Sequence, residues 1–569
     1  MLTSNKSTML KNYVSATILA SALLFSGSAN AQLEQQNIIA DPGRLEQSLI
    51  EDKLVPQVGP AIRVKELALQ TAPAGAENIK FNFGGLHLEG AGAYSEDTLY
   101  PLYKDMVGTE ISLADLYALA NRMALKYRND GFVLTQVVVP PQTIEKGIAR
   151  LQIVEGFIDN IIIQGGDEKN SALKTVQEYA TQISQGGALN IADMERQLLL
   201  INDLPGISAR SVISPSATTS GAADLLVIIE RDPYDAVIGA NNHGSRFLGP
   251  FQVNGAGALN SALGFNEAIT AQFVVAPDRG AELAFGSIGY EQPVGPWGTK
   301  LSITGSITDT DPGFTLRPFE VEGLSKSITL QATHPLIRSR STNVFGRLLF
   351  DWRDIDSKNN VEVTRQDRIR ALRAGLQAEF LDSLIGVAVN TIDLQVSQGL
   401  NVLGSSDEDD ANMTRAAGDP TFTKANIRLQ RLQRITSKVN VLLEGRGQLS
   451  NNPLLSSEEF GLGGISTVRG YDPSEIVGDD GIAGKIEVQW KPASNTQLFS
   501  FLDAGTVWQQ DPTSSADKRN SLVSTGVGVR VDLPMNVDAE LVAAQPLHRD
   551  VQTRGNREPQ YFFSVNKEF

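Results

Sequence analysis

The spacing of apolar residues between positions 80 and 231 predicts a small α+β unit that occurs twice. Apolar and polar residues alternate from Phe81 to Leu88, as in a strand with one buried face. Apolar residues then recur at helical spacing from Leu116 to Tyr127, and two further strands are predicted at Val133–Val139 and Ile148–Val154. The order is therefore strand, helical region, helix, strand and strand.

Capping residues mark both ends of the helix in the first unit. Ser112 is followed three residues later by Asp115, which is the spacing of a capping box. Gly131 lies where a helix needs a left-handed residue to stop. The same order of elements returns at once, with segments at residues 158–164, 171–184, 190–201, 207–214 and 225–231. The chain thus contains two tandem copies of one unit.

Beyond position 231 the helical spacing disappears, and short alternating segments separated by Gly, Pro, Asn and Asp replace it. Ile328, Leu330 and Ala332 alternate with polar residues, and the segments around Leu372 and Val439 repeat this pattern. One apolar and one polar face is typical of a membrane barrel, whose sheet must close because lipid tolerates no open edge. The remaining 338 residues (569 − 231) accommodate about 16 strands at roughly 21 residues each.

The last segment of the chain also alternates and ends on an aromatic residue. Tyr561, Phe563, Val565 and Phe569 share one face, and Lys567 on that face departs from the pattern. A terminal strand of this kind resembles the signal by which barrels are handed to the outer-membrane assembly machinery. A soluble β-sandwich or β-solenoid is the alternative for this half of the chain.

The first 31 residues have the features of a secretory signal peptide. Lys6 and Lys11 precede a largely apolar run from Tyr13 to Phe25, and Ala29-Asn30-Ala31 offers small residues to a signal peptidase. The apolar run is shorter than the about 20 residues that a membrane-spanning helix needs. We therefore predict a signal peptide at residues 1–31.

Residues 32–78 are interpreted as an N-terminal tether. Asp41-Pro42-Gly43 predicts the start of a short helix, and Leu45, Leu49 and Leu54 would lie along one side of it. Pro56 would end such a helix. A tether without regular structure is the alternative interpretation.

Composition narrows the function classes. The 569 residues carry a net charge of −16, which argues against a nucleic-acid partner, and 0 Cys excludes thiol chemistry and cysteine metal sites. The four histidines have no metal-ligand spacing, and the sequence contains no nucleophile elbow and no phosphate-binding loop. We expect no metal site and no cofactor, and an enzyme is the function class with the least support.

Residues 452–484 are glycine-rich, polar and too long for a hairpin turn, so they predict a major loop. Two short motifs stand out in this part of the chain, Val468-Arg469-Gly470-Tyr471 in the loop and Phe501-Leu502-Asp503-Ala504-Gly505 on a later strand. They resemble the VRGY and F-x-D-x-G motifs of the barrel superfamily that includes BamA.

This resemblance implies that the loop folds back inside the barrel. Arg469 would pair with Asp503, Gly470 would permit a tight backbone, and Tyr471 would pack beside them. The pairing is physically reasonable, because an acid on the lipid side of a strand is costly and arginine can grip a carboxylate with two bonds.

The two α+β units resemble the polypeptide-transport-associated (POTRA) domains of TpsB transporters, the ShlB/FhaC/HecB-like haemolysin secretion/activation family. In the first unit, the likeness is carried by Tyr127–Phe132, Val139–Ile144, Gly147-Ile148 and Ile153–Gly156. In the predicted barrel, Asn241–Arg246, His334–Ser339 and the loop 452–484 are also similar to that family. Two POTRA domains fit this family, whereas BamA-type insertases usually have five and TamA-type proteins three. The resemblance implies POTRA domains at residues 79–157 and 158–231, then a transmembrane antiparallel β-barrel at 232–569. It also implies that a helix of the tether can plug the pore.

The implied function is export through the outer membrane. The POTRA domains would recognise an unfolded large exoprotein in the periplasm, an adhesin, cytolysin or toxin of TpsA type, without nucleotide hydrolysis. Outer-membrane lipid and the barrel assembly machinery would be further partners. Exposed strand edges bind extended chains by β-augmentation, and the candidate edges are residues 207–214 and the strand of Val133, Thr135, Val137 and Val139. An insertase for other barrels and a passive porin are the alternatives.

Overall fold

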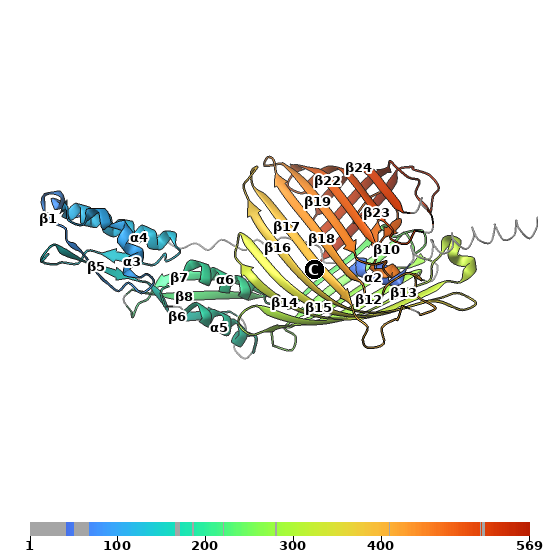
Figure 1. Cartoon of the computed structure of the whole chain (residues 1–569), viewed down its shortest axis with the longest axis horizontal. Helices are drawn as coiled ribbons and strands as arrows, with labels where there is room; N and C mark the ends of the chain where they lie inside the picture. Colours follow the sequence, from blue (N-terminus) through green and yellow to red (C-terminus); the bar gives the residue numbers. More distant parts are fainter. Residues whose placement is uncertain are drawn as a thin grey trace, which may run out of the picture.

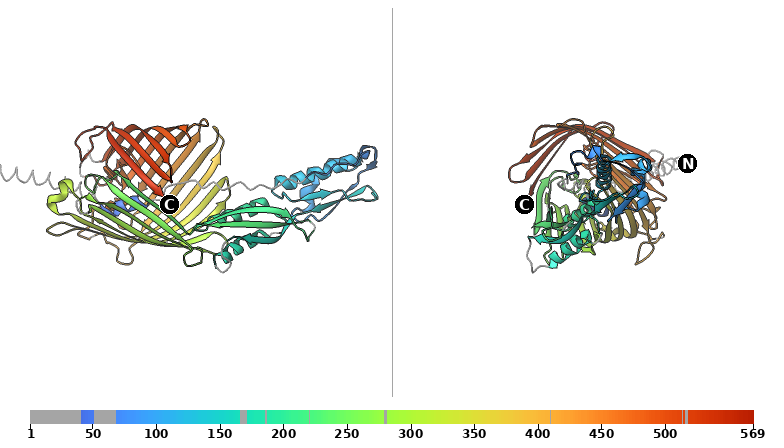
Figure 2. Two further views of the ribbon diagram at one scale, coloured as in Figure 1. Left: turned by 180° about the vertical axis from the view of Figure 1, so that it is seen from behind. Right: turned by 90° about the vertical axis from the view of Figure 1, so that its left-hand side faces the viewer.

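The computed structural model describes residues 41–50, 68–165, 171–184, 187–219, 221–278, 281–408, 410–512, 514 and 518–569. The predicted signal peptide, and Leu54 of the tether, lie outside these residues. A closed barrel carries two small α+β units that project in a row from one of its ends (Figures 1 and 2). None of the described helices combines the length and the apolar character needed to cross a bilayer.

The first unit packs one long helix on short strands. Ser112 and Asp115 form the predicted capping box at the start of this helix, and Asp130 follows its last turn. Leu116, Leu119 and Met123 on its inner face are fully buried. The elements are η1 Ala76–Asn78, β1 Lys80–Asn82, β2 Gly85–Glu89, α3 Glu96–Leu99, η2 Tyr100–Leu102, η3 Lys104–Met106, β3 Glu110–Ser112, α4 Leu113–Asn129, β4 Gln136–Val138 and β5 Ile148–Val154.

Two predicted strands of the first unit differ from the structure. The predicted strand 81–88 is two strands, because the chain turns where Gly84 donates its amide to Gly147, so β1 pairs with β3 and β2 with β5. The predicted strand 133–139 is only β4, because a turn closed by Thr135 and Phe132 follows α4. Sequence alternation cannot show either turn.

The second unit repeats the arrangement with longer strands. Its sheet has the order β6-β8-β7, with β6 parallel and β7 antiparallel to β8. Asn190 caps the second helix by accepting the amide of Ala192 at 2.9 Å, and its backbone neighbours bond to the first unit at Gly131 and Gly156. The elements are β6 Phe157–Gln164, α5 Ser171–Ser184, α6 Ile191–Asn202, β7 Ile207–Pro215 and β8 Ala222–Arg231.

Sixteen antiparallel strands close the barrel, as the sequence predicts, with β26 pairing back onto β9. The strands in order are β9 Tyr234–Asn241, β10 Gln252–Asn260, β11 Ala268–Ala276, β12 Leu283–Val294, β13 Thr299–Thr310, β14 Glu322–Arg338, β15 Thr342–Lys358, β16 Val363–Asp382, β17 Ala388–Gly399, β18 Thr423–Arg434, β19 Val439–Ser450, β22 Asp480–Ala493, β23 Thr496–Trp508, β24 Arg519–Leu533, β25 Val537–Pro546 and β26 Gln560–Glu568. A 3-10 helix, η5 Phe314–Phe319, lies in the connection after β13.

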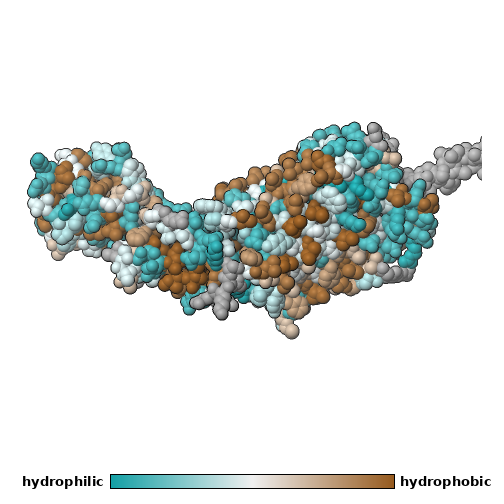
Figure 3. All heavy atoms as spheres, turned by 90° about the horizontal axis from the view of Figure 1, so that it is seen from below, coloured by the Kyte–Doolittle hydropathy of each residue, from teal (hydrophilic) through white to brown (hydrophobic). Residues whose placement is uncertain are grey.

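The two faces of the barrel wall follow the alternation of the sequence. Ile328 and Leu330 on β14 are 44% and 46% exposed, while Ser325 and Ser327 of the same strand point inward and are buried. Apolar side chains cover much of the outer surface, and hydrophilic ones gather at the end farthest from the two units (Figure 3). The outward residues are therefore those that lipid would cover.

Two segments of the chain occupy the lumen. The first is helix α2 Pro42–Ile50, which begins where Asp41-Pro42-Gly43 predicts and packs against β13, β14 and β15 (Figure 1). The second is the connection between β19 and β22, residues 451–479, which we call the lumenal loop. It contains η6 Ser456–Glu458 and a small hairpin of β20 Phe460–Leu462 and β21 Ile476–Gly478. It ends at β22, five residues before the predicted boundary of 484.

Candidate functional site

The tetrad of the lumenal loop lies against the inner wall of β22–β24. Val468 is 0% exposed and packs among Leu462, Ala483 and Val507. Gly470 has φ +91°, a conformation that residues with a side chain rarely adopt. A methyl group there would also meet the side chains of Ala544 and Pro546 at 3.3–3.5 Å. The backbone of the tetrad therefore approaches the wall too closely for most residues.

Arg469 grips Asp503 of β23 in the lumen. Its Nε and Nη2 donate to the two carboxylate oxygens at 2.7 and 2.8 Å, and its backbone amide donates to Oδ2 at 3.1 Å. The guanidinium also lies 3.5 Å from the ring centroid of Phe501. Asp503 is 0% and Arg469 5% exposed. Two buried charges thus satisfy each other with bidentate geometry, which is the arrangement in which such a pair is stable.

The remaining motif residues pack the lumenal loop against the wall on either side of the Arg469–Asp503 pair. The Tyr471 hydroxyl donates to the carbonyl of Val523 at 3.1 Å and accepts the amides of His548 and Arg549. Gly505 on β23 leaves room for Leu462 of the loop, because a Cβ there would lie 2.8 Å from that side chain. The structure therefore brings all seven motif residues to one patch of the wall.

Sequence reasoning missed two members of this cluster. Glu487 of β22 accepts from Arg469 Nη1 at 2.7 Å and from Arg530 of β24 at 2.7 Å. Arg530 in turn lies over the ring of Phe499 and pairs with Glu540 of β25 at 2.5 Å. The alternation of β22 puts Glu487 on the lumenal face, so that pattern was the available signal. Its partners depend on strand register, which one sequence does not provide.

Helix α2 is held to the opposite wall by a buried carboxylate. Glu46 is 0% exposed and accepts hydrogen bonds from the hydroxyls of Ser306, Ser325 and Ser327 on β13 and β14. Gly43 lies so close to β15 that a side chain at this position would overlap Ile355. Leu45 and Leu49 pack on an apolar cluster around Phe247 and Phe285. The helix therefore fits its seat through one acid, one glycine and two leucines.

The same helix contacts the first half of the lumenal loop. Arg44 donates to the Ser456 carbonyl at 3.1 Å and pairs with Glu459 at 2.9 Å, and Gln47 donates to Glu458 at 3.0 Å. Glu458 is fully buried and also pairs with Arg373 at 2.8 Å and Lys424 at 2.7 Å. This half of the loop thus bridges α2 and the wall of β15–β18.

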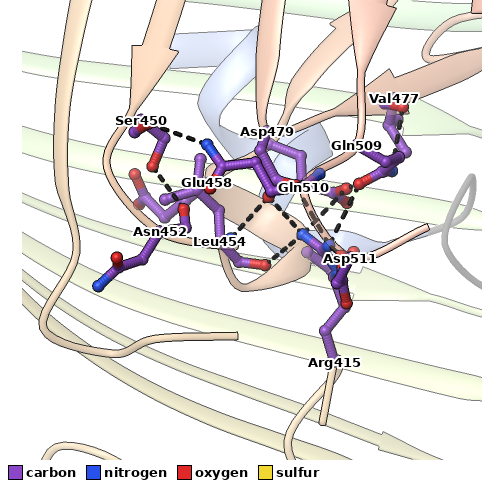
Figure 4. A network of polar contacts seen from close by, with 12 residues as sticks. Arg415, Ser450, Asn452, Leu454, Glu458, Val477, Asp479, Gln509, Gln510 and Asp511 are labelled. Carbon is purple, nitrogen blue, oxygen red and sulfur yellow. Dashed lines mark hydrogen bonds and ion pairs between the residues drawn. The ribbon is translucent and has the colours of Figure 1, made fainter. Parts of the chain in front are cut away.

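The base of the lumenal loop is tied to the neighbouring connections at the end of the barrel away from the two units. Arg415 donates to Asp479 at 2.6 Å and to the carbonyl of Leu454 at 2.7 Å, and it also pairs with Asp511 (Figure 4). Asp479 accepts the amides of Leu454 and Gln510 at 2.7 and 2.8 Å. The loop is therefore fixed at its base independently of α2.

The candidate strand edges lie on the projecting units. β4 and β7 are both outer strands of their sheets, in the orders β2-β5-β4 and β6-β8-β7. The side chains of Thr135, Val137 and Val139 are buried in the first unit, and Val133 lies in the turn before β4. Gln136 is exposed and Val138 half-buried on the other face of β4, so a partner at this edge would meet these side chains as well as the main chain.

The polar groups of the lumen are built for binding between segments rather than for bond chemistry. The buried carboxylates of Glu458, Asp503 and Glu46 are bonded to arginines, a lysine or serine hydroxyls. Within the described ranges, no group of three or more His, Cys, Asp or Glu side chains is placed to hold a metal ion. These contacts hold two segments of the chain inside the barrel.

Comparison with known proteins points to one group. The chain is 23% identical over 486 residues to the heme/hemopexin transporter protein HuxB of Haemophilus influenzae strain 86-028NP, covering 83% of this chain and 84% of HuxB. It is 25% identical over 438 residues to the outer membrane transporter CdiB-2 of Burkholderia pseudomallei, covering 74% and 72%. It is similar in fold to the solved CdiB from Escherichia coli, with a TM-score of 0.73 at 19% identity over 95% of this chain and 98% of that one.

Two family models match the chain itself. The model of the ShlB-type POTRA domain matches residues 81–156, within the first unit. The model of the haemolysin secretion/activation protein ShlB/FhaC/HecB matches residues 225–531, more than half of the chain. The chain belongs to the ShlB/FhaC/HecB family of haemolysin secretion/activation proteins.

Proposed function

We propose that this outer-membrane barrel exports a large partner polypeptide from the periplasm to the cell surface. The observation that carries the proposal is a closed barrel whose lumen holds two segments of its own chain, α2 and the lumenal loop. A pore that must admit a polypeptide only when one is present needs a removable occupant. HuxB and CdiB-2 are both named as transporters, which agrees with this.

The two projecting units receive the partner in this proposal. β4 and β7 are outer strands of their sheets, and an extended chain that adds to such an edge by β-augmentation can have many sequences. Val133, Thr135, Val137 and Val139 are the candidate residues at the β4 edge, and the amides of Val133, Thr135 and Val139 would exchange their bonds to Gly131, Phe132 and Gln70 for the partner. The second unit lies at the rim of the barrel, so a chain bound on it is delivered to the pore (Figure 2).

Within the barrel, α2 acts as the plug and the lumenal loop as a fixed wall element. Arg469 and Asp503 lock the loop to β23 while α2 leaves, which opens space along β13–β15. The mechanism requires no catalytic group, cofactor or metal. Folding of the partner outside the cell supplies direction, because a folded domain cannot return through the lumen.

An insertase for other barrels is the second candidate, and one observation favours it. The chain has a TM-score of 0.50 with BamA from Haemophilus ducreyi at 13% identity. That similarity is lower than the one to CdiB, and the presence of two units agrees with the transporter. A passive porin has no use for two peptide-binding units or a filled lumen.

The test compares the proteins released by cells that carry or lack this chain. The proposal expects one large polypeptide to disappear from the medium and cell surface of the deletion strain, to remain in the periplasm, and to return on complementation. Unchanged release together with a general loss of other barrels would instead support the insertase.

A further inference from the structure

The second unit is joined to the barrel by a buried, forked ion pair. Arg338, the last residue of β14, donates Nε and Nη2 to the two oxygens of Asp203 after α6 at 2.8 and 2.7 Å. Its Nη1 donates to Asn343 of β15 at 2.8 Å. Arg338 is 6% exposed. All three nitrogens of the guanidinium are therefore used, two on the second unit and one on the barrel.

A second set of contacts lies within a few residues of the first. Arg340, in the turn between β14 and β15, donates Nε to Glu195 of α6 at 2.7 Å and its amide to the same carboxylate at 2.9 Å. Arg196 of α6 donates in the reverse direction, to the carbonyl of Pro335 at 3.1 Å. Arginines therefore donate from the barrel to α6 and from α6 to the barrel, which fixes the position of α6 on the turn.

A β-bulge in β14 makes this geometry possible. Even-numbered residues of this strand, such as Ile328 and Leu330, face outward, and unbroken alternation would put Arg338 on that side. The register shifts between Pro335 and Ile337, so Leu336 is an extra residue and Arg338 turns inward. Proline commonly occurs at such a bulge because it lacks the N–H that the ladder would need.

Apolar packing at the next turn supports the same joint. A Cβ on Gly298, between β12 and β13, would lie 2.5 Å from Leu200 of α6 and 2.7 Å from Pro335. Two neighbouring turns of the barrel and helix α6 of the second unit therefore share one contact area.

We propose that Arg338 and Arg340 are positioning residues that hold the second unit at a fixed angle on the rim of the pore throughout export. The inference rests on the proposed export function and adds the residues that orient the second unit relative to the pore. A bidentate pair that is nearly inaccessible to water dissociates rarely, because separation would strand a charge at the interface. Movement of the receiving apparatus is then confined to the first unit and to α2.

The test uses charge exchange in the full-length chain. Arg338→Asp and Asp203→Arg are made singly and together, and Lys358→Ala removes a matched control pair on the same two barrel strands, since Lys358 and Glu322 are 58% and 55% exposed at 2.7 Å. Release of the dependent polypeptide is measured, with the barrel content of the outer membrane checked in parallel. Because the chain has 0 Cys, spin labels at Ser208→Cys and Ser437→Cys report the angle of the second unit in lipid nanodiscs.

Each single exchange should broaden the label distances and lower release at least about fivefold, and the double exchange should restore both. The Leu336 deletion should reproduce the single exchange, while Lys358→Ala should match wild type. Single exchanges that release normally, or a loss that the double exchange does not recover, would overturn the positioning role. In either case wild-type release still stands, so the proposed function fails only if wild type releases nothing.

Discussion

Two of the buried carboxylates in the lumen, Asp503 and Glu46, are satisfied in different ways. Asp503 of the wall receives three bonds from Arg469 of the lumenal loop, two of them from the guanidinium. Glu46 of α2 receives neutral hydroxyls from Ser306, Ser325 and Ser327. Both acids accept charge-assisted bonds, but only Asp503 is paired with an opposite charge in bidentate geometry. In the proposed mechanism, this difference makes the lumenal loop the fixed segment and α2 the removable one.

The contacts around each acid support the same distinction. Breaking the Arg469 contact leaves Asp503 buried without its cation, while Glu487 keeps its pair with Arg530. When α2 leaves, Glu46 enters water and three serines remain, which are small, neutral and easily hydrated. When Arg44 leaves with α2, Glu459 of the lumenal loop loses that ion pair but keeps the one with Arg415 at 3.3 Å. The wall therefore remains electrostatically balanced without α2 but not without the loop.

The largest effect on this comparison between Asp503 and Glu46 is expected when Arg469 is removed. Arg469→Ala should lower the free energy of unfolding of the barrel by about 3–5 kcal/mol, because the buried Asp503 loses its cation and Glu487 loses one of its two. The shift is measured as the temperature at which the folded band disappears on semi-native gels. Arg557→Ala is the control, since the Arg557–Asp550 pair is more than half exposed and should contribute little. Equal effects of the two variants would contradict the stabilising role of the Arg469–Asp503 pair.

The next variant tests the weaker seat of α2. Glu46→Ala removes three hydrogen bonds to a charged group, so the plugged state should lose about 2 kcal/mol and the open fraction should rise more than tenfold. Single-channel conductance in planar bilayers measures this fraction. Ser48→Ala is matched to it, because that hydroxyl bonds only within α2, to the Leu45 carbonyl. A Glu46→Ala channel that stays as closed as wild type would show that other contacts seat the helix.

A smaller effect is expected from a substitution at Gly470, next to Arg469 in the tetrad. Gly470→Ala should cost about 1–2 kcal/mol, because φ +91° is unfavourable for a residue with a Cβ. Gly286→Ala on β12 is the control, as nothing lies within 4 Å of its Cβ position. Thermal unfolding in detergent compares the two. If both variants unfold together, the close approach of the tetrad to the wall does not contribute to stability.

The smallest effect lies outside the barrel and tests whether local changes stay local. Ser112→Ala should cost about 1 kcal/mol of α4 stability, because it removes the cap of that helix. The Ser112 backbone and side-chain bonds hold the pKa of Asp115 below its usual range. This contribution is present above the unfolded pKa near 3.9 and is lost as the pH falls through the lower folded value. Hydrogen exchange of the α4 amides measures the stability of this helix in Ser112→Ala and in wild type, and unchanged exchange would contradict the prediction.

Alternation and spacing were sufficient to predict the architecture, because both follow from local chemistry. Ile328 and Leu330 face outward since the strand period is two, and Ser112 caps α4 because its oxygen meets an amide three residues later. The pairing of Arg469 with Asp503 could be proposed only from the resemblance. Nothing local connects residues 34 positions apart across a lumen.

What the sequence could not provide depends on register and on turns. Glu487 joins the lock because β22 and β23 pair in one register, and the bulge at Leu336 turns Arg338 to the second unit. The seat of Glu46 combines serines from two strands more than 250 residues away. A shift by one residue would reverse the face of each of these side chains, so only the folded chain reveals them.

The most direct test of the distinction between the two lumenal segments is cysteine labelling during export. Leu45→Cys on α2 and Val468→Cys in the lumenal loop are made separately, and the exported polypeptide is halted in the pore by fusing it to a stably folded domain. A membrane-impermeant maleimide then reports access. We expect Leu45→Cys to react faster when the pore is occupied, while Val468→Cys stays protected. If α2 stays protected in the occupied pore, or if Val468→Cys becomes equally reactive, the account of a fixed loop and a removable helix is contradicted.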